Sequence, residues 1–205
     1  MAKSVLAGIC GAALLVLPVS VNAFGFRGAE IGMTLSAWKS LPPPEQLTGK
    51  GVAYCSDDPA ESAKPSFAKL GSDIPDEVKC IYADAEGNGV FQRIGMLSTR
   101  PFYHFYKGQL YSIELSANAL SNSDILRSMR DKYGPPAKTE TGVFQTQSGS
   151  TFPQVTTTWG QGKQVIMVTA PDDRVDSMTV KIFDGEAMQS VLDARRAMDP
   201  SAYKF

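Results

Sequence analysis

The chain has 205 residues, with 20 basic and 21 acidic side chains and 43% hydrophobic residues. These values are typical of an ordinary globular chain and exclude a disordered tail, a collagen and a coiled coil. A formal net charge of −1, without a run of like charges, offers no positive surface to a phosphate backbone, so nucleic-acid binding is not expected. One histidine and three cysteines leave little material for a zinc site or a histidine-based catalytic set, and we expect no cofactor.

Residues 1–23 have the organisation of a secretory signal peptide. Lys3 precedes the apolar run Val5–Leu17, and Val21 and Ala23 occupy the −3 and −1 positions of a signal-peptidase site. The apolar run is shorter than the roughly 20 residues that span a bilayer. We predict cleavage after Ala23, no transmembrane span after cleavage, and a periplasmic or secreted protein. A retained N-terminal anchor is the alternative.

Cleavage removes Cys10 and leaves two cysteines, Cys55 and Cys80. In an oxidising compartment these two allow a single intramolecular pairing. We therefore predict a disulfide between Cys55 and Cys80 that holds down the Pro-, Ser- and Asp-rich stretch 57–78. Two free thiols are the alternative.

The first half of the mature chain is predicted to contain one short helix and then strands. An extended arm over 24–33 leads to Thr34, a good N-cap for a helix that presents Trp38 and ends before Pro42. Period-two patterns and turn residues then predict strands at 78–83, 90–97, 102–106 and 109–116.

At Ser121 the hydrophobic period changes from two residues to 3.6, which predicts a helix that ends before Gly134. Ser121 and Asp124 match a capping box at its start. Further strands are predicted at 138–145, 154–159, 163–169 and 177–183. Asp184 is expected to cap a last helix over 186–198.

This order of elements predicts an α+β fold in a single domain over 24–205. We expect an antiparallel meander sheet with the helices packed on one face. A helix followed by four strands occurs twice, which indicates a possible tandem repeat of about 30–117 and 120–200. The other face of the sheet would be open to solvent or to a partner.

Two short stretches resemble known envelope proteins. Ile31-Gly32-Met33-Thr34-Leu35 resembles the Gly-Met-Thr helix opening of the outer-membrane assembly lipoproteins of the SmpA/OmlA (BamE) type, and Tyr133-Gly134-Pro135-Pro136 resembles their passage from helix to strand. The lipidated cysteine of that family is absent. The doubled helix-plus-four-strand order is similar to the β-lactamase-inhibitor-protein fold, which implies protein binding on the open face of the sheet.

The weak candidate for a metal site is a calcium-loop pattern. Asp84, Glu86 and Asn88 stand at positions 1, 3 and 5 of the pattern, and Gly89 at position 6 permits its sharp turn. Position 12 is Gly95, where the pattern needs a bidentate glutamate. We therefore expect a polar hairpin turn without a metal, with calcium binding as the alternative.

Catalysis has two weak candidates. Asp172, Asp173 and Asp176 form a carboxylate cluster between two predicted strands, which favours a solvated turn over acid–base chemistry. His104 lies mid-strand with no assignable nucleophile or acid partner. We expect that the protein is not an enzyme, and a carboxylate-based hydrolase is the least favoured alternative.

The densest aromatic patch comprises Phe102, Tyr103, Phe105, Tyr106 and Tyr111. Alternation along a strand sends one set into the core and the other to the open face, where aromatic side chains are preferred contacts for a partner. Tyr103 and Phe105 are the expected exposed members. Cover by loops or by the N-terminal arm is the alternative.

Together these patterns predict a non-catalytic protein-interaction module of the bacterial cell envelope. Its role would be inhibitor-like or assembly-factor-like, and its partner another envelope or extracellular protein. The alternative is a carrier of a small apolar or lipid ligand, for which Met129, Met188 and Met198 could supply adaptable side chains.

Overall fold

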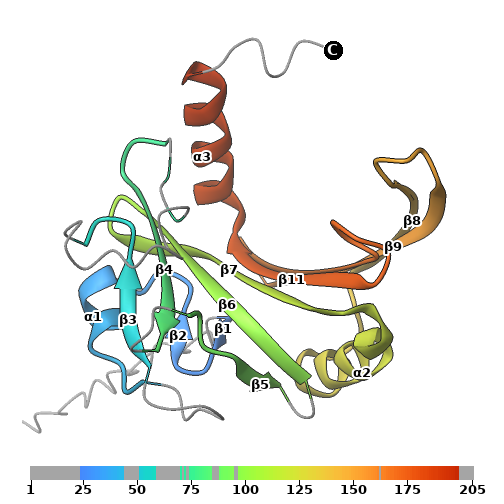
Figure 1. Ribbon diagram of the computed structural model, residues 1–205, viewed down its shortest axis with the longest axis horizontal. Helices are drawn as coiled ribbons and strands as arrows, with labels where there is room; N and C mark the ends of the chain where they lie inside the picture. Colours follow the sequence, from blue (N-terminus) through green and yellow to red (C-terminus); the bar gives the residue numbers. More distant parts are fainter. Residues whose placement is uncertain are drawn as a thin grey trace, which may run out of the picture.

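A computed structural model describes residues 24–43, 51–58, 70, 72, 74–84, 88–94, 97–161 and 163–198. One antiparallel sheet dominates the molecule (Figure 1), and its strand order is β3-β4-β6-β7-β11-β10-β9-β8. The short strand β5 pairs with β6 on the edge that β4 also uses. The predicted signal peptide, 1–23, lies outside the described residues.

The part of the chain before α2 begins with a small hairpin and continues into five strands of the large sheet. Its elements are β1 (Gly25–Phe26), β2 (Ala29–Glu30), α1 (Leu35–Lys39), β3 (Val52–Cys55), β4 (Glu77–Ala83), β5 (Gln92–Ile94), β6 (Leu97–Tyr106), β7 (Gln109–Asn118) and the 3-10 turn η3 (Ala119–Ser121).

The second part adds four strands between two helices. Its elements are α2 (Asn122–Tyr133), β8 (Lys138–Gln145), β9 (Thr151–Gln161), β10 (Gln164–Ala170), β11 (Ser177–Asp184) and α3 (Gly185–Met198). The last strand, β11, pairs with β7 and thereby joins the two parts into one sheet. The α+β class and the antiparallel sheet predicted from the sequence are confirmed.

The main core lies on the face of the sheet that α1 and α2 cover, which we call the core face. Trp38 of α1 is fully buried, and its ring centroid is 4.9 Å from those of Tyr82 and Tyr103. Ile125 of α2 joins the same cluster, as do inward residues of β7, β10 and β11 such as Ile113. Burying side chains of this size stabilises by roughly 1.5–3 kcal/mol each.

Helix α3 lies on the opposite face, so the expectation that all helices share one face is wrong (Figure 1). Its buried residue Val191 packs with Tyr111 and Ile74 in a cluster separate from the main core. The reason lies in β11, because Met178, Val180 and Ile182 already commit the other side of that strand to the core face. Helix α3 stands on this second face, which we call the open face.

Strand β6 is longer than the sequence pattern indicated because it continues through Pro101. On one side β6 pairs with β7 at Arg100 and Pro101. On the other side β5 pairs only as far as Thr99, and β4 begins to pair at Tyr103. Pro101 therefore occupies a gap in the ladder where no backbone donor is needed, which is how a strand tolerates proline.

Several local predictions differ from the structure. The arm expected over 24–33 contains the hairpin β1–β2, and β3 lies between Pro42 and residue 78, where no strand is predicted from the sequence. Ser121 makes no side-chain cap for α2. It is the last residue of the preceding 3-10 turn, which Asn118 caps by accepting from the Leu120 N–H. Asp184 caps α3 as predicted, accepting hydrogen bonds of 3.0 Å from the N–H groups of Glu186 and Ala187. In the described part of the chain, no helix has the length and apolarity needed to cross a bilayer.

Candidate functional site

The aromatic patch divides between the two faces of the sheet, as strand alternation requires. Tyr103 and Phe105 are 1% and 0% exposed and belong to the core face, so the expectation that they are exposed is wrong. The alternate residues Phe102 and Tyr106 are half-buried and lie on the other side of β6. Tyr111 is also buried, under α3. Most of the predicted aromatic interaction surface is therefore interior packing.

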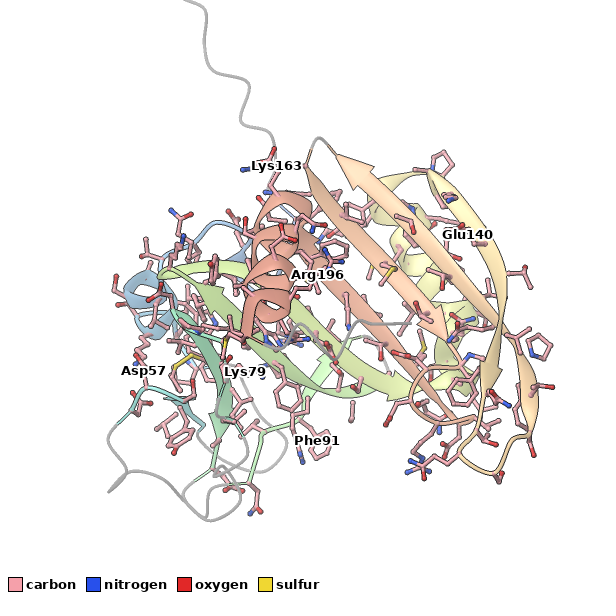
Figure 2. All side chains as sticks on the ribbon, turned by 90° about the horizontal axis from the view of Figure 1, so that it is seen from above. Asp57, Lys79, Phe91, Glu140, Lys163 and Arg196 are labelled. Carbon is pink, nitrogen blue, oxygen red and sulfur yellow. A yellow bond between two sulfur atoms is a disulfide. The ribbon has the colours of Figure 1, made fainter. Side chains whose placement is uncertain are left out.

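The open face of β7, β11, β10, β9 and β8 carries half-buried and exposed side chains and is the candidate binding surface. On this side the sheet curves from β11 toward β8, and α3 rises at its other end (Figure 1). Figure 2 looks onto this face and shows Glu140 of β8 and Arg196 of α3 on opposite sides of it. Among the described elements, α3 is the single helix on this side.

Directly paired residues form rows across the open face. One row runs through Thr158, Met167, Lys181 and Glu114, from β9 to β7. Lys181 and Glu114 form a half-buried ion pair with an N–O distance of 3.3 Å. In this row the apolar side chain of Met167 lies beside an ion pair whose two charges neutralise each other.

The next row consists of hydroxyl groups. It runs through Thr156, Thr169, Thr179 and Ser116. The hydroxyls of Thr156 and Thr169 are 3.2 Å apart and hydrogen-bonded. At the β8 edge this row continues to Glu140, which forms an ion pair of 2.8 Å with Lys138. The open face is thus polar, rich in hydroxyl groups and close to neutral.

A cleft of about 630 Å³ lies at one end of the second half of the sheet. The β8–β9 turn and the β10–β11 turn form its walls, with Phe144, Ser148 and Val175 among its lining residues. Val175 is 42% exposed, so the cleft offers apolar area between polar loops.

A buried polar cluster surrounds Glu77, at the start of β4. The Tyr111 hydroxyl donates a hydrogen bond of 2.6 Å to Oε1 of Glu77, and the Ser72 hydroxyl donates to Oε2. Nδ1 of His104 lies 3.6 Å from Oε1. The Glu77 side chain is 1% exposed. Four segments therefore converge on one carboxylate beneath α3.

The cluster keeps Glu77 ionised. Burial alone would raise the pKa of Glu77, but the neighbouring His104 imidazole and the hydrogen bonds from Ser72 and Tyr111 lower it to about 2. Burial and the adjacent carboxylate raise the pKa of Tyr111 well above its usual value, so its proton stays in the hydrogen bond. Both groups thus have fixed protonation states near neutral pH, which suits a structural role better than proton transfer.

Sequence reasoning missed Glu77 as the partner of His104. Glu77 ↔ Tyr106 and Lys79 ↔ His104 are paired positions of β4 and β6, which brings the two side chains to the same face. No local motif joins residues so far apart in the chain. A carboxylate at the first position of a strand whose last four residues are buried was the available signal.

The calcium-loop candidate closes a hairpin turn. Oδ1 of Asp84 accepts a hydrogen bond of 2.7 Å from the Asn88 N–H, and Oδ2 accepts one of 3.3 Å from its side-chain amide. Glu86 lies outside the described residues. In the described part of the chain, no group of three or more His, Cys, Asp or Glu side chains is arranged to hold a metal ion.

The aspartate cluster of the alternative hydrolase hypothesis forms the β10–β11 turn. Arg174 makes a two-pronged contact with Asp176, with N–O distances of 3.0 and 2.7 Å. Asp173 is exposed and has a left-handed backbone (φ 61°), a conformation that aspartate tolerates in turns. These carboxylates are turn groups that face solvent.

The methionines of the alternative carrier hypothesis do not meet in one cavity. Met129 packs against the core on the side of α2, whereas Met188 belongs to the cluster under α3 on the open face. Met198, at the end of α3, is 52% exposed. The sheet therefore separates the side chains that a shared ligand pocket would require.

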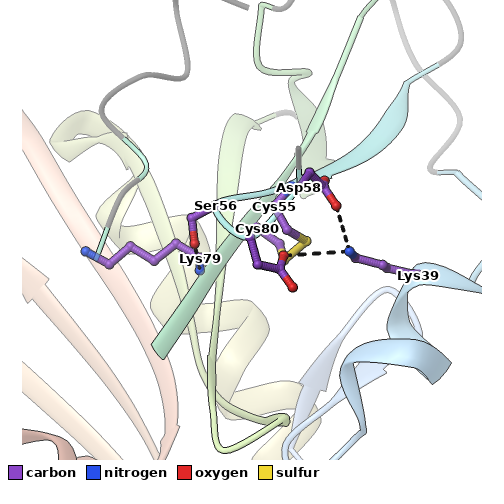
Figure 3. Close-up of a disulfide and its surroundings, with 7 residues drawn as sticks. Lys39, Cys55, Ser56, Asp58, Lys79 and Cys80 are labelled. Atoms are coloured by element: carbon purple, nitrogen blue, oxygen red, sulfur yellow. Dashed lines mark hydrogen bonds and ion pairs between the residues drawn. A yellow bond between two sulfur atoms is a disulfide. The ribbon is translucent and has the colours of Figure 1, made fainter. Parts of the chain in front are cut away.

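The predicted disulfide is present and joins directly opposite residues of β3 and β4. Both cysteines are fully buried. Figure 3 shows Lys39 of α1 beside this bridge, with Nζ 2.9 Å from Asp58 and 3.7 Å from Asp57. The bridge and these ion pairs fasten the edge strand β3 to β4 and α1.

Comparison of the chain with protein-family models, curated proteins and solved structures finds no match.

Proposed function

We propose that this protein is a non-catalytic interaction module that binds another folded protein on the open face of its sheet. The observation that carries the proposal is the two-sidedness of the second half of the sheet. One side of β10 and β11 is buried in the core. The other carries the rows from Thr158 to Glu114 and from Thr156 to Ser116, whose members are half-buried or exposed apart from Thr179, which is buried.

The charges of the open face favour a neutral, polar partner surface. Lys181 is paired with Glu114, and Lys138 with Glu140, so the rows present no excess of either charge. Hydroxyl groups both donate and accept hydrogen bonds, and Met167 adds adaptable apolar area. Such a surface fits a protruding loop or hairpin whose backbone and neutral side chains form hydrogen bonds.

The dimensions fit a protein better than a small molecule. Five neighbouring strands span about 19 Å, and eight residues of strand span about 26 Å, which gives roughly 500 Å² of flat surface. Helix α3 and the cleft near Val175 extend this area. The total approaches the roughly 800 Å² that one partner buries in a standard protein interface.

The proposal places the protein in the periplasm or outside the cell, where the Cys55–Cys80 bridge would persist. It also includes the tandem organisation, about 30–117 and 120–200, with β7 and β11 at the junction. An inhibitor-like or assembly-factor-like role then depends on which envelope protein occupies the open face.

Site-specific photocrosslinking in the native periplasm tests the proposal. A crosslinking amino acid replaces Thr158, on the open face, and in a matched strain Thr139, an exposed residue that β8 directs to the other side of the sheet. We expect one dominant protein adduct from position 158 that position 139 does not give. Identical protein adducts from both positions, no protein adduct, or a small-molecule adduct at 158 would each contradict the proposal.

A further inference from the structure

Phe24 is built into the fold although it directly follows the predicted signal peptide. Its side chain is 4% exposed, and its ring packs edge-on against Tyr133 at a centroid distance of 5.0 Å. Its carbonyl accepts a hydrogen bond of 3.0 Å from the Ile31 N–H, which closes the β1–β2 hairpin over it. Both the side chain and the backbone of Phe24 are therefore part of the packed structure.

The backbone nitrogen of Phe24 has a specific partner from the far end of the chain. It lies 2.7 Å from Oε1 of Gln164, at the start of β10, in a partly buried position. Gln164 is paired with Asp184 of β11, the residue that caps α3. The first described residue is thus fixed at the corner where β10, β11 and α3 meet.

We propose that hydrolysis of the Ala23–Phe24 peptide bond creates an N-terminal ammonium group at the nitrogen that already donates to Gln164, so that signal-peptide removal adds a positive charge to this contact. Water adds across the bond, the carboxylate stays on Ala23, and the amine of Phe24 takes up a proton. The nitrogen then carries a positive charge and donates a charge-assisted hydrogen bond to the amide oxygen, which is stronger than the bond from a neutral N–H.

The contacts of Phe24 and Gly25 show what cleavage at a later bond would remove from the fold. A cut after Phe24 would remove its buried ring, and a cut after Gly25 would also remove the pairing of Gly25 with Glu30. Val21 and Ala23 stand at the −3 and −1 positions that a signal peptidase reads. Cleavage at the bond that the sequence predicts therefore keeps both Phe24 and Gly25 in the folded chain.

The processing step is tested by mass spectrometry of the protein purified from a periplasmic extract. We expect a chain that begins at Phe24. A23L should leave the precursor uncut, whereas N22A, at the unread −2 position, should be processed normally. A mature chain with another first residue, or normal cleavage of A23L, would overturn the assignment of the bond.

The ammonium contact is tested on the chain that begins at Phe24, with and without N-terminal acetylation, which removes the charge and keeps an N–H. Acetylation should lower Tm by about 2–4 °C in the wild type. It should have no further effect in Q164L, while Q145L, at an exposed position of β8, should respond like the wild type. Equal responses of Q164L and wild type, or no response in either, would overturn the contact. These readouts are independent of the proposed partner.

Discussion

The Tyr111 hydroxyl donates a hydrogen bond of 2.6 Å to the carboxylate of Glu77, a residue 34 positions earlier in the chain. The ring of Tyr111 also packs with Val191 of α3. One side chain therefore connects a buried charge to the helix that borders the open face. The position of α3, and with it one wall of the proposed binding surface, depends on this contact.

Removing the Tyr111 hydroxyl should destabilise the fold. Tyr111→Phe leaves the ionised, buried Glu77 with one donor fewer, which is expected to cost about 1–3 kcal/mol in the free energy of unfolding. Urea denaturation of Tyr111→Phe and of Tyr106→Phe, a half-buried control on β6, measures the difference. Equal small losses in both variants would show that the hydrogen bond to Glu77 contributes little.

Stability should fall with acid through Glu77. Burial would raise the pKa of Glu77, but His104, Ser72 and Tyr111 lower it from 4.5 to about 2. Because the pKa of Glu77 is lower in the folded than in the unfolded chain, the ionised carboxylate stabilises the folded state. This contribution is complete above about pH 4.5, the pKa in the unfolded chain, and declines as the pH falls toward 2. The shift corresponds to about 3 kcal/mol.

Unfolding measured from pH 5 to pH 2 tests this expectation. The wild type should lose stability more steeply than Glu77→Gln, and the exposed control Glu140→Gln should follow the wild type. Parallel curves for wild type and Glu77→Gln would contradict the assigned role of Glu77.

The disulfide should be complete and stabilising. Thiol titration of the unfolded protein that begins at Phe24 should find no free thiol. The bridge closes a loop with a sequence separation of 25, and restricting this loop in the unfolded chain is worth about 3.5 kcal/mol. The double variant Cys55→Ala/Cys80→Ala should lose stability by about this amount in urea. Two thiols per chain would contradict both the bridge and the oxidising compartment.

The cap of α3 offers a local test. Asp184→Ala removes the acceptor of two backbone N–H groups and should cost about 0.5–2 kcal/mol, whereas Asp184→Asn retains the cap. Amide hydrogen exchange should show faster exchange across α3 in Asp184→Ala alone. Equal exchange rates in the two variants would show that the Asp184 cap does not stabilise α3.

Local patterns in the sequence predicted most strands because alternation and turn residues act over a few positions. Lys107-Gly108 is one such signal, and both residues have the positive φ values that a tight hairpin turn needs. The predicted strand started after Pro101, whereas β6 continues through it. A strand accepts proline there only because β5 stops pairing before Pro101 and β4 starts pairing after it. That information is not local.

The sites were harder to predict because burial depends on which face each helix covers. Alternation correctly placed Tyr103 and His104 on opposite faces of β6. It could not predict that α1 packs Trp38 against Tyr103. The position of α3 on the other face is likewise a property of the assembled sheet. The contact between His104 and Glu77 arises from strand pairing between β4 and β6 and leaves no motif in the sequence.

The open face as a binding surface is tested most directly by the affinity for the crosslinked partner, purified and measured by calorimetry. Met167→Arg and Thr158→Arg, neighbours in one row of the open face, should weaken Kd at least about tenfold, which corresponds to roughly 1.4 kcal/mol. Thr139→Arg, on the other side of β8, should leave Kd unchanged. Wild-type affinity in both open-face variants, or equal weakening in all three, would contradict the account.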